Sequence, residues 1–316
     1  MKAYVQHKYG SSETLNIEEV KTPLIGADEI LVQIKAVSLN PADWHMMRAK
    51  PSFIRLMSGL FKPKKKIIGS DFAGKVVSVG ANVSAYKVGD EVFGEATSGS
   101  FAEYNKVKLN MLALKPENSS YQEAACLGIA GLTALQGIRD HGKLAAGEKV
   151  LINGASGGVG HYCVQIAKAL GGHVTAVCSA KNSDFVKSLG ADEVIDYTTT
   201  NIHSHQAHFD LTVDVHGNLN FKDFKRFAGK NGRAVMIGFT GMGHMLKVLA
   251  SKAVSKSNIA QFTASAKSED LQYLAQLYKD GQLKSSIERT YSFNQLPEAI
   301  SYIEQMHTQG KVAVSV

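Results

Sequence analysis

The sequence predicts an α/β protein of two domains, in which a doubly wound parallel sheet is joined to a mainly antiparallel β domain. A strand, a glycine-rich turn, a helix and a second strand follow one another within residues 149–181. Strands and helices keep alternating to residue 237, whereas the first 120 residues show short strands separated by glycine and proline. The chain has 316 residues, which is more than one typical hydrophobic core requires.

The segment from residue 149 to 181 organises the rest of the chain. Its β-branched start, Val150 to Ile152, predicts a strand, and a second run of this kind covers residues 173–178. Between them, apolar residues recur at helical spacing until Gly171 and Gly172 end the helix. The whole segment therefore predicts one right-handed βαβ crossover.

The turn between the first strand and the helix is rich in glycine. A diphosphate can approach backbone N–H groups at a helix N-terminus only where no Cβ stands in the way. With the correct strand and helix on either side, the turn indicates dinucleotide binding. We expect the contacts to come from Gly154, Ser156, Gly157, Gly158, Val159 and Gly160.

The end of the second strand indicates which nicotinamide cofactor to expect. NAD-binding proteins usually place an acidic residue about 20 residues beyond the glycine turn. Here no carboxylate occurs before Asp184, while Ser179 and Lys181 suit a 2′-phosphate. We therefore predict NADPH rather than NADH; the alternative is that Lys181 is a solvated residue at the start of a helix.

The remaining elements follow the same two patterns. In the first domain we expect strands at 3–6, 29–39, 74–79, 91–93 and 100–107. A helix at 122–137, broken near Gly128 and Gly131, is expected to begin the second domain. Further on we expect helices at 184–189, 221–227, 269–279 and 295–306, and strands at 193–197, 210–215, 233–237 and 311–316. The expected domains are 1–121, with 283–316 returning to it, and 122–282.

Composition excludes several classes of protein. No apolar run approaches the roughly 20 residues that span a bilayer, and the first ten residues are not typical of a signal peptide, so we expect a cytoplasmic protein without integral membrane association. Three widely spaced cysteines indicate neither a disulfide framework nor a zinc site. The formal charge of +7 fits a polyanionic cofactor without requiring nucleic acid.

Several motifs together resemble one known family over nearly the whole chain. They are SLNPADW at 38–44, IIGSDFAGKVVSVG at 67–80, AGLTALQ at 130–136, NGASGGVGHYCVQIAK at 153–168, VKSLGADEVIDY at 186–197 and GKVAVSV at 310–316. The chain resembles the zinc-independent quinone oxidoreductases of the medium-chain dehydrogenase/reductase superfamily, in particular the chloroplast-envelope and reticulon-4-interacting types. The resemblance implies a GroES-like domain, a Rossmann domain and a homodimer.

Two positions differ from the zinc-dependent relatives. Where those enzymes hold a catalytic zinc with Cys and His, this chain has Asn40 and Ser70, and their four-cysteine lobe is absent. An amide and a hydroxyl are poor zinc ligands, so we expect no metal. The expected reaction is hydride transfer from NADPH to a quinone or to the β-carbon of an α,β-unsaturated carbonyl compound.

The resemblance also implies roles for residues outside the glycine turn. Asn40, Asp43 and Trp44 are expected beside the nicotinamide; the alternatives are that Asp43 caps a turn and that Trp44 is a core residue. The expected cofactor contacts are Thr133 at the carboxamide, Tyr197 on the adenosine side, and Gly238, Phe239 and Lys311 near the nicotinamide. Because relatives often carry Tyr near Trp44, no general acid is assigned.

Two clusters outside these sites have less specific interpretations. His203, His205 and His208 match no known zinc spacing, and we interpret them as a solvated loop. The basic run at 62–66 follows an apolar stretch at 53–61. We interpret it as a solvated loop, with docking to an anionic membrane surface as the alternative.

Two functions remain open at this point. The first is an NADPH-dependent reductase of quinones or enones. The second is an NADPH-binding sensor or an RNA-binding protein without significant catalysis, which the positive charge supports. Because the chain lacks the aromatic and basic motifs that bind bases, the reductase is our main prediction.

Overall fold

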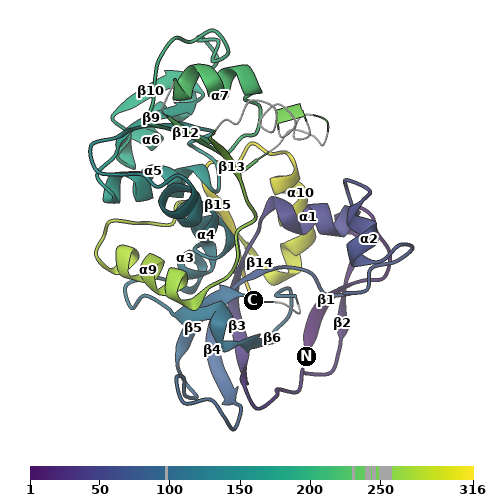
Figure 1. Ribbon diagram of the computed structural model, residues 1–316. Coiled ribbons are helices and arrows are strands. Elements are labelled where there is room, and N and C mark those ends of the chain that lie inside the picture. The colour runs from purple at the N-terminus through teal and green to yellow at the C-terminus, as the bar shows by residue number, and fades with distance from the viewer. Residues whose placement is uncertain (97–98, 230–231, 239–242, 244–246, 249–257) are drawn as a thin grey trace. The chain divides into compact units, whose positions relative to one another are not determined.

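The computed structural model describes residues 1–96, 99–229, 232–238, 243, 247–248 and 258–316 (Figure 1). Its contacts divide the chain into two compact units. The first unit comprises Met1–Leu132 and Ala266–Val316, and the second comprises Thr133–Ser265. No helix among the described residues is long and apolar enough to cross a bilayer.

The first unit is built on a mainly antiparallel sheet of seven strands in the order β14-β15-β3-β4-β5-β7, with β6 paired to β3. The C-terminal strand β15 lies antiparallel to β3, so the C-terminal segment returns to the sheet that the first part of the chain forms. A two-stranded sheet, β1-β2, lies apart. The bounds are β1 Lys2–Gln6, β2 Leu15–Glu19, β3 Glu29–Ser38, β4 Asp71–Val79, β5 Glu91–Glu95, β6 Tyr104–Lys108, β7 Leu112–Leu114, β14 Ile287–Ser292 and β15 Lys311–Ser315.

The first unit also contains short helices. They are α1 Pro41–Arg48, α2 Ile54–Ser58, α3 Tyr121–Cys126, α9 Ser268–Lys279 and α10 Leu296–Glu304, with single 3₁₀ turns at η1 Ser12–Thr14, η2 Leu109–Met111 and η5 Phe293–Gln295. Of these helices, α3, α9 and α10 pack on strands of this sheet. The buried core joins alternate residues of β3 to Phe72, Phe101 and the apolar face of α10. This period-two alternation is what a half-buried antiparallel strand requires.

The second unit is a six-stranded parallel sheet in the order β10-β9-β8-β11-β12-β13. This is the strand order of a Rossmann sheet, whose switch point lies between the first and fourth strands, here β8 and β11. The strands are β8 Lys149–Asn153, β9 His173–Cys178, β10 Glu193–Asp196, β11 Leu211–Asp214, β12 Arg233–Met236 and β13 Ile259–Gln261. The helical elements are α5 Gly160–Ala169, α6 Ser183–Ser188, α7 Phe221–Ala228, the π-helical turn η3 Gln136–His141 and the 3₁₀ turn η4 Ala180–Asn182.

Most predicted elements are confirmed to within a few residues, including β8, α5 and β9 of the organising segment. The predicted strand at 100–107 is shorter, because its first part instead bonds Ile68 and Gly69 and forms a single bridge to Ala3. The helix predicted at 122–137 is α3 and α4 (Ile129–Leu135), broken at Gly128 but continuous through Gly131. The strand β14 was not predicted.

The contact-based division differs from the expected domain limits at 121/122 and 282/283. Both α3 and α9 pack on strands of the first unit, which moves the limits to 132/133 and 265/266. The expected domains, 1–121 with 283–316 and 122–282, stay a prediction.

Candidate active site

The glycine turn follows β8 at the switch point of the second unit. Gly154 has φ +84°, a conformation that favours glycine, and a Cβ there would lie 3.0 Å from the backbone nitrogen of His216, which follows β11. At Gly160, the first residue of α5, a Cβ would lie 2.0 Å from the carbonyl oxygen of Gly154. Both glycines are therefore required by the fold itself.

Gly157 differs from these two glycines. Of the atoms that the structure describes, a Cβ at Gly157 would meet only the Gly154 carbonyl oxygen, at 3.6 Å, which is an ordinary van der Waals distance. Packing within the protein thus gives no reason for glycine at this position. A ligand that must come close to the backbone of the turn does give one, because a diphosphate binds to bare N–H groups at a helix N-terminus.

The strand ends beneath the turn are held by a buried polar cluster. Asn153 Nδ2 donates to Asp214 Oδ1 at 2.7 Å and to Asn218 Oδ1 at 2.7 Å, which joins the carboxyl ends of β8 and β11. The Asp214 carboxylate also accepts from the Gly217 and Leu219 N–H groups, although burial raises its pKa. These bonds fix the switch point before any ligand binds.

The predicted phosphate residues lie together beyond β9. Ser179 is buried at the start of η4, and Lys181 is exposed two residues later. The Asp196 carboxylate, from the end of β10, accepts from Ala180 N at 3.0 Å, Thr198 N at 2.9 Å and the Thr198 hydroxyl at 2.7 Å. These hydrogen bonds lower the pKa of Asp196. Asp196 therefore shapes the backbone between Ser179 and Lys181.

Other predicted cofactor residues of the second unit have varied surroundings. The Ser156 hydroxyl accepts from Asn182 Nδ2 at 2.9 Å, which ties the glycine turn to η4. Tyr197 is exposed and Thr133, in α4, is half-buried. Gly238 follows β12, where a Cβ would lie 2.2 Å from the carbonyl oxygen of Val215, so packing alone requires glycine there. Phe239 lies outside the described residues.

In the first unit, the predicted residues Asn40 and Lys311 meet in a buried polar cluster. Lys311 Nζ donates to Asn40 Oδ1 at 2.6 Å and to the Leu39 carbonyl oxygen at 3.0 Å. Asn40 Nδ2 in turn donates to Asp71 Oδ2 at 2.8 Å, and Lys311 Nζ lies 3.8 Å from the same oxygen. All three side chains are at most 3% exposed. The Asn40 amide is thus held at both ends.

Asp71 has a further donor that explains the break between α3 and α4. The Ile129 N–H, at the start of α4, donates to Asp71 Oδ1 at 2.7 Å. A Cβ on Gly128 would lie 2.2 Å from this oxygen, so only glycine admits the carboxylate to the helix end. Burial raises the pKa of Asp71, while Lys311, Asn40 and the Ile129 N–H act in the opposite direction.

Two more carboxyl groups lie close to Asp71. Asp43 Oδ2 accepts from Asn40 N at 2.8 Å, which confirms the capping interpretation, and burial raises its pKa to about 7. Glu95 pairs directly with Asp71 across β4 and β5. Burial, with Asp71 and Asp43 nearby, raises the pKa of Glu95 to about 8. Three carboxyl groups and one ammonium group therefore share this cluster.

Trp44 lies in α1 beside Asp43. Its ring stacks on that of His45, with centroids 3.7 Å apart, and packs against the core of the first unit. Among the described residues, its buried Nε1–H has no acceptor. An unsatisfied buried donor costs about 1–3 kcal/mol, so an oxygen atom of a bound molecule would be stabilised there.

Asn40, which the resemblance to zinc-dependent enzymes aligns with a zinc ligand, has surroundings that do not fit this metal. Asn40 already accepts from Lys311 and donates to Asp71, and the Lys311 ammonium group supplies the positive charge beside that carboxylate. No group of three or more metal-binding side chains occurs in the described part of the chain. His203 instead bonds Asp223, and His208 bonds the Arg226 carbonyl oxygen.

Sequence reasoning missed three carboxylates: Asp196, beside the predicted phosphate residues, and Asp71 and Glu95, in the buried cluster around Asn40. Asp196 is followed, after Tyr197, by three threonines, and an Asp in such a polar turn often bonds the backbone that follows it, so this signal was available. Asp71 and Glu95 become neighbours only through strand pairing, and no local pattern marks them.

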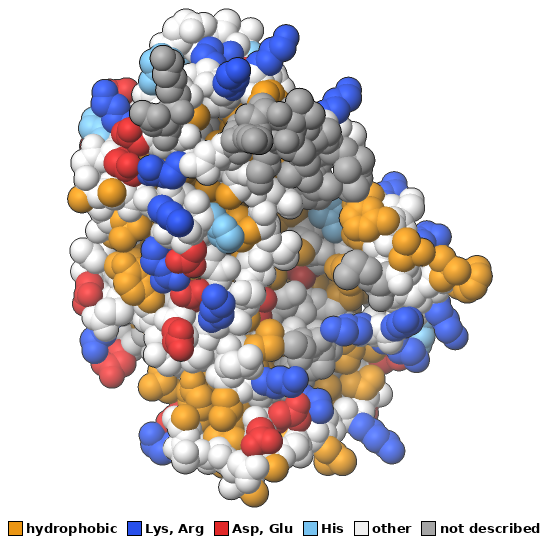
Figure 2. Space-filling model, viewed as in Figure 1, with side chains coloured by type: hydrophobic (Ala, Val, Ile, Leu, Met, Phe, Trp, Pro, Cys, Tyr) orange, Lys and Arg blue, Asp and Glu red, His pale blue; other side chains and the backbone are white. Residues whose placement is uncertain are grey.

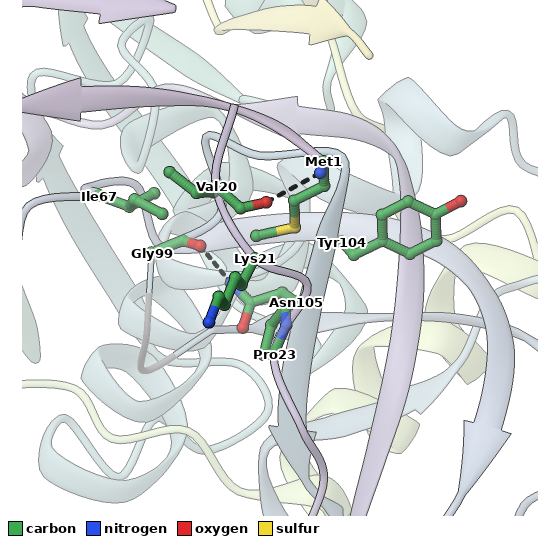
Figure 3. Close-up of a pocket in the computed structure, with 8 residues that line it drawn as sticks. All are labelled: Met1, Val20, Lys21, Pro23, Ile67, Gly99, Tyr104 and Asn105. Atoms are coloured by element: carbon green, nitrogen blue, oxygen red, sulfur yellow. Dashed lines mark hydrogen bonds between the residues drawn. The ribbon is translucent and has the colours of Figure 1, made fainter. Parts of the chain in front are cut away.

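A separate cavity of about 230 Å³ lies in the first unit, with Met1, Val20, Ile67, Tyr104 and Asn105 among its lining residues (Figure 3). The Met1 ammonium group donates to the Val20 carbonyl oxygen at 2.9 Å, and Asn105 donates to the Gly99 carbonyl oxygen. None of the lining residues belongs to either predicted site.

Comparisons with known proteins agree with this geometry. A model of the alcohol dehydrogenase GroES-like domain matches residues 26–188, and a model described as zinc-binding dehydrogenase matches residues 189–314. The chain thus combines a GroES-like domain with a Rossmann domain.

Individual relatives cover nearly the full chain. The chloroplast envelope quinone oxidoreductase homolog of Arabidopsis thaliana is 33% identical over 330 residues, covering 99% of this chain and 98% of the relative. The NADPH-dependent alkenal/one oxidoreductase of the same plant is 31% identical, covering 99% and 79%. The solved quinone oxidoreductase of Coxiella burnetii is 28% identical with a TM-score of 0.88, covering 100% and 99%. With its glycine turn at the Rossmann switch point, the chain belongs to the quinone oxidoreductase family of the medium-chain dehydrogenase/reductase superfamily.

Proposed function

We propose that this protein is an NADPH-dependent reductase that transfers a hydride to quinones or to α,β-unsaturated carbonyl compounds without a metal ion. The observation that carries the proposal is Gly157, where packing of the described residues does not require glycine and no Cβ covers the backbone at the switch point. The relatives named for quinone and alkenal/one substrates support the same reaction.

The preference for NADPH rests on Ser179 and Lys181. Asp196 bonds backbone and hydroxyl groups of its own surroundings, so this carboxylate is engaged in the fold rather than offered to a ribose. Lys181 is exposed and can pair with a 2′-phosphate, and the Ser179 hydroxyl can donate to the same group. Tyr197, also exposed, lies one residue after Asp196 and would cover the adenosine side.

The glycine turn would hold the diphosphate. The backbone N–H groups of Gly158 and Val159 are the donors in this proposal, and Gly157, whose own N–H donates to the Gly154 carbonyl oxygen at 3.3 Å, keeps the approach free of a Cβ. Gly154 and Gly160 give the turn its shape, and Ser156 ties it to η4. Thr133, Gly238 and Phe239 remain proposed contacts of the nicotinamide end. The bound cofactor supplies the hydride, which adds two electrons to the acceptor, and a proton from solvent completes the reduction.

The first unit would receive the acceptor near Asn40 and Trp44. Lys311 was expected to contact the nicotinamide, but its ammonium group is bonded to Leu39 and Asn40. We propose that Lys311 and Asp71 hold the Asn40 amide in one orientation, with Asp43 fixing the start of α1 below it. The Trp44 Nε1–H is then a donor for an acceptor oxygen.

Three further properties belong to this proposal. The amide of Asn40 and the hydroxyl of Ser70 are poor zinc ligands, which favours a reaction that needs no zinc. The family resemblance favours a homodimer, and we retain the expected domains 1–121 with 283–316, and 122–282. We also retain the expected cytoplasmic location as part of this proposal.

The test is NADPH oxidation by the purified protein, followed over a panel of quinones and of enones. We expect turnover with at least one of the two classes. If neither class is reduced although NADPH binds, the chain is not a reductase of this kind and the binding-only alternative is favoured. If NADPH does not bind, the assignment of the glycine turn is wrong.

A further inference from the structure

The segment between Asp43 and Asp71 has an unusual charge balance. Residues 44–70 contain seven Lys or Arg residues and no Asp or Glu. The formal net charge of the whole chain is also +7, so the positive and negative charges of the rest of the chain cancel. The excess charge of this protein is therefore concentrated in one short segment of the first unit.

The same segment exposes large apolar side chains. Phe53, Leu56, Leu60 and Phe61, here called the apolar tip, are 42%, 76%, 55% and 90% exposed. Other exposed large apolar residues, such as Leu24 and Val88, occur singly along the chain, which is normal for a protein surface. Four within nine residues form a cluster, and such clusters mark surfaces that bind a partner or a membrane.

Basic side chains accompany the apolar tip. Arg55, Lys62, Lys64, Lys65 and Lys66, here called the basic rim, are all exposed. Figure 2 shows hydrophobic side chains projecting at the edge of the molecule with Lys and Arg beside them, in the area where Figure 1 places α2. Arg48 is the exception among the basic residues, because it pairs with Glu304.

The fold holds this segment in a defined conformation. The Lys64 N–H donates to the Ser58 carbonyl oxygen at 2.8 Å, which closes a loop that presents Leu60, Phe61 and Lys62. The Tyr9 hydroxyl donates to the Gly59 carbonyl oxygen at 2.8 Å. Gly59 has φ +124°, and a Cβ there would lie 2.1 Å from the Lys62 carbonyl oxygen, so the loop requires glycine. The exposed apolar side chains are thus displayed on a loop that hydrogen bonds from Lys64 N and from the Tyr9 hydroxyl hold in place.

We propose that the apolar tip and basic rim form a docking surface for an anionic membrane. Apolar side chains that can enter the boundary between headgroups and acyl chains, flanked by lysines that face anionic headgroups, are the features of an interfacial membrane anchor. The absence of acidic residues from 44 to 70 favours an anionic surface over a neutral one. This surface binds the membrane reversibly and does not depend on the proposed reaction.

The test is co-sedimentation of the full-length protein with vesicles. We expect binding to phosphatidylcholine vesicles that contain phosphatidylglycerol, weaker binding at high salt, and little binding to phosphatidylcholine alone. Each lysine near an anionic surface contributes about 1 kcal/mol, or about fivefold in affinity, so Lys62→Gln with Lys64→Gln should weaken binding about 25-fold. Leu60→Ser with Phe61→Ser should weaken it at least tenfold.

Matched variants control for charge and for exposed apolar area. Lys222→Gln with Lys225→Gln removes two exposed lysines from α7, and Leu24→Ser with Val88→Ser removes two exposed apolar residues of the first unit. These controls should bind as the unmodified chain does, and thermal melting should show that all four variants fold. Equal losses in controls and tip variants would overturn the proposal, as would absence of binding to anionic vesicles. Self-association that the Leu60 and Phe61 variant abolishes, without vesicle binding, would assign the surface to a second copy of the chain instead.

Discussion

The two regions that carry the proposed function are built in opposite ways. In the first unit, Asn40, Asp71 and Lys311 are buried and bonded to one another, so the protein completes this cluster by itself. In the second unit, the nearest described atom to a Cβ at Gly157 would be the Gly154 carbonyl oxygen, at an ordinary van der Waals distance of 3.6 Å. The difference indicates that the first region is preorganised to orient a few polar groups, whereas the second is kept open for a ligand.

The largest predicted effect tests the completed cluster. Lys311→Met removes the ammonium group and leaves the buried Asp71 carboxylate without its counter-charge. Breaking a buried ion pair in this way costs about 3–5 kcal/mol. Urea denaturation should show this loss in the free energy of unfolding, and the double variant Lys311→Met with Asp71→Asn should recover part of it. Lys181→Met, at an exposed position, should change stability by less than about 0.5 kcal/mol.

If Lys311→Met proved as stable as the unmodified chain, the cluster would not be held by this ion pair. The account of Asn40 as an amide fixed from both sides would then be wrong.

A second prediction compares two glycines of the open turn. In Gly160→Ala the new Cβ meets backbone atoms of Gly154 and Ala155, so unfolding should become easier by about 1–3 kcal/mol. In Gly157→Ala the Cβ meets no close atom, so stability should change by less than about 0.5 kcal/mol. The dissociation constant for NADPH should nevertheless rise at least about tenfold in Gly157→Ala, because the Cβ enters the space proposed for the diphosphate. Calorimetric titration and denaturation of both variants separate these effects.

Should Gly157→Ala bind NADPH unchanged, the space at this glycine would not be the diphosphate site.

The third prediction concerns the choice of cofactor. Lys181→Ala removes a charge that pairs with the 2′-phosphate but with no part of NADH. A hydrogen bond to a charged group contributes about 1.5–3 kcal/mol, so the dissociation constant for NADPH should rise at least about tenfold while that for NADH stays constant. Lys187→Ala, on α6, is a control that should alter neither constant. Equal changes for the two cofactors would remove Lys181 from the phosphate site.

A fourth and more gradual effect follows from the carboxyl cluster of the first unit. The pKa of Asp43 is raised to about 7 and that of Glu95 to about 8, so the folded protein binds protons that the unfolded chain releases near pH 4. Stability from these groups is therefore complete below about pH 4 and is lost as the pH rises through about 7 to 8. Glu95→Gln should flatten this fall in urea midpoints, by at most about 1.4 kcal/mol per pH unit, whereas Glu298→Gln, at an exposed site, should not. A steeper fall in Glu95→Gln would contradict the assignment.

The two regions also differ in how well the sequence predicted them. The glycine turn, β8, α5 and β9 lie within thirty residues and are governed by local patterns, so they were predicted almost residue by residue. Asp71 lies 31 residues and Lys311 lies 271 residues from Asn40 in the chain. The three residues meet because β15 pairs with β3 and β3 pairs with β4. Local patterns cannot show such pairing. The expected role of Lys311 at the nicotinamide therefore came from the resemblance alone. The hydrogen bonds of Lys311 to Leu39 and Asn40 could not be predicted from the sequence.

The break at Gly128 illustrates the same limit. Glycine in an apolar helical pattern predicted an interruption, but Gly128 and Gly131 were equivalent by this criterion. Only the position of the Asp71 carboxylate shows that the first is required, because the second packs against Leu274 inside a continuous helix.

The most direct test of the account is turnover of the purified protein with NADPH and a reducible quinone or enone, before and after exhaustive treatment with a metal chelator. The account predicts that chelation leaves the rate unchanged, because the Asn40 amide oxygen is bonded to the Lys311 ammonium group and an amide is a poor zinc ligand. Loss of activity on chelation, restored by added zinc, would contradict the central claim.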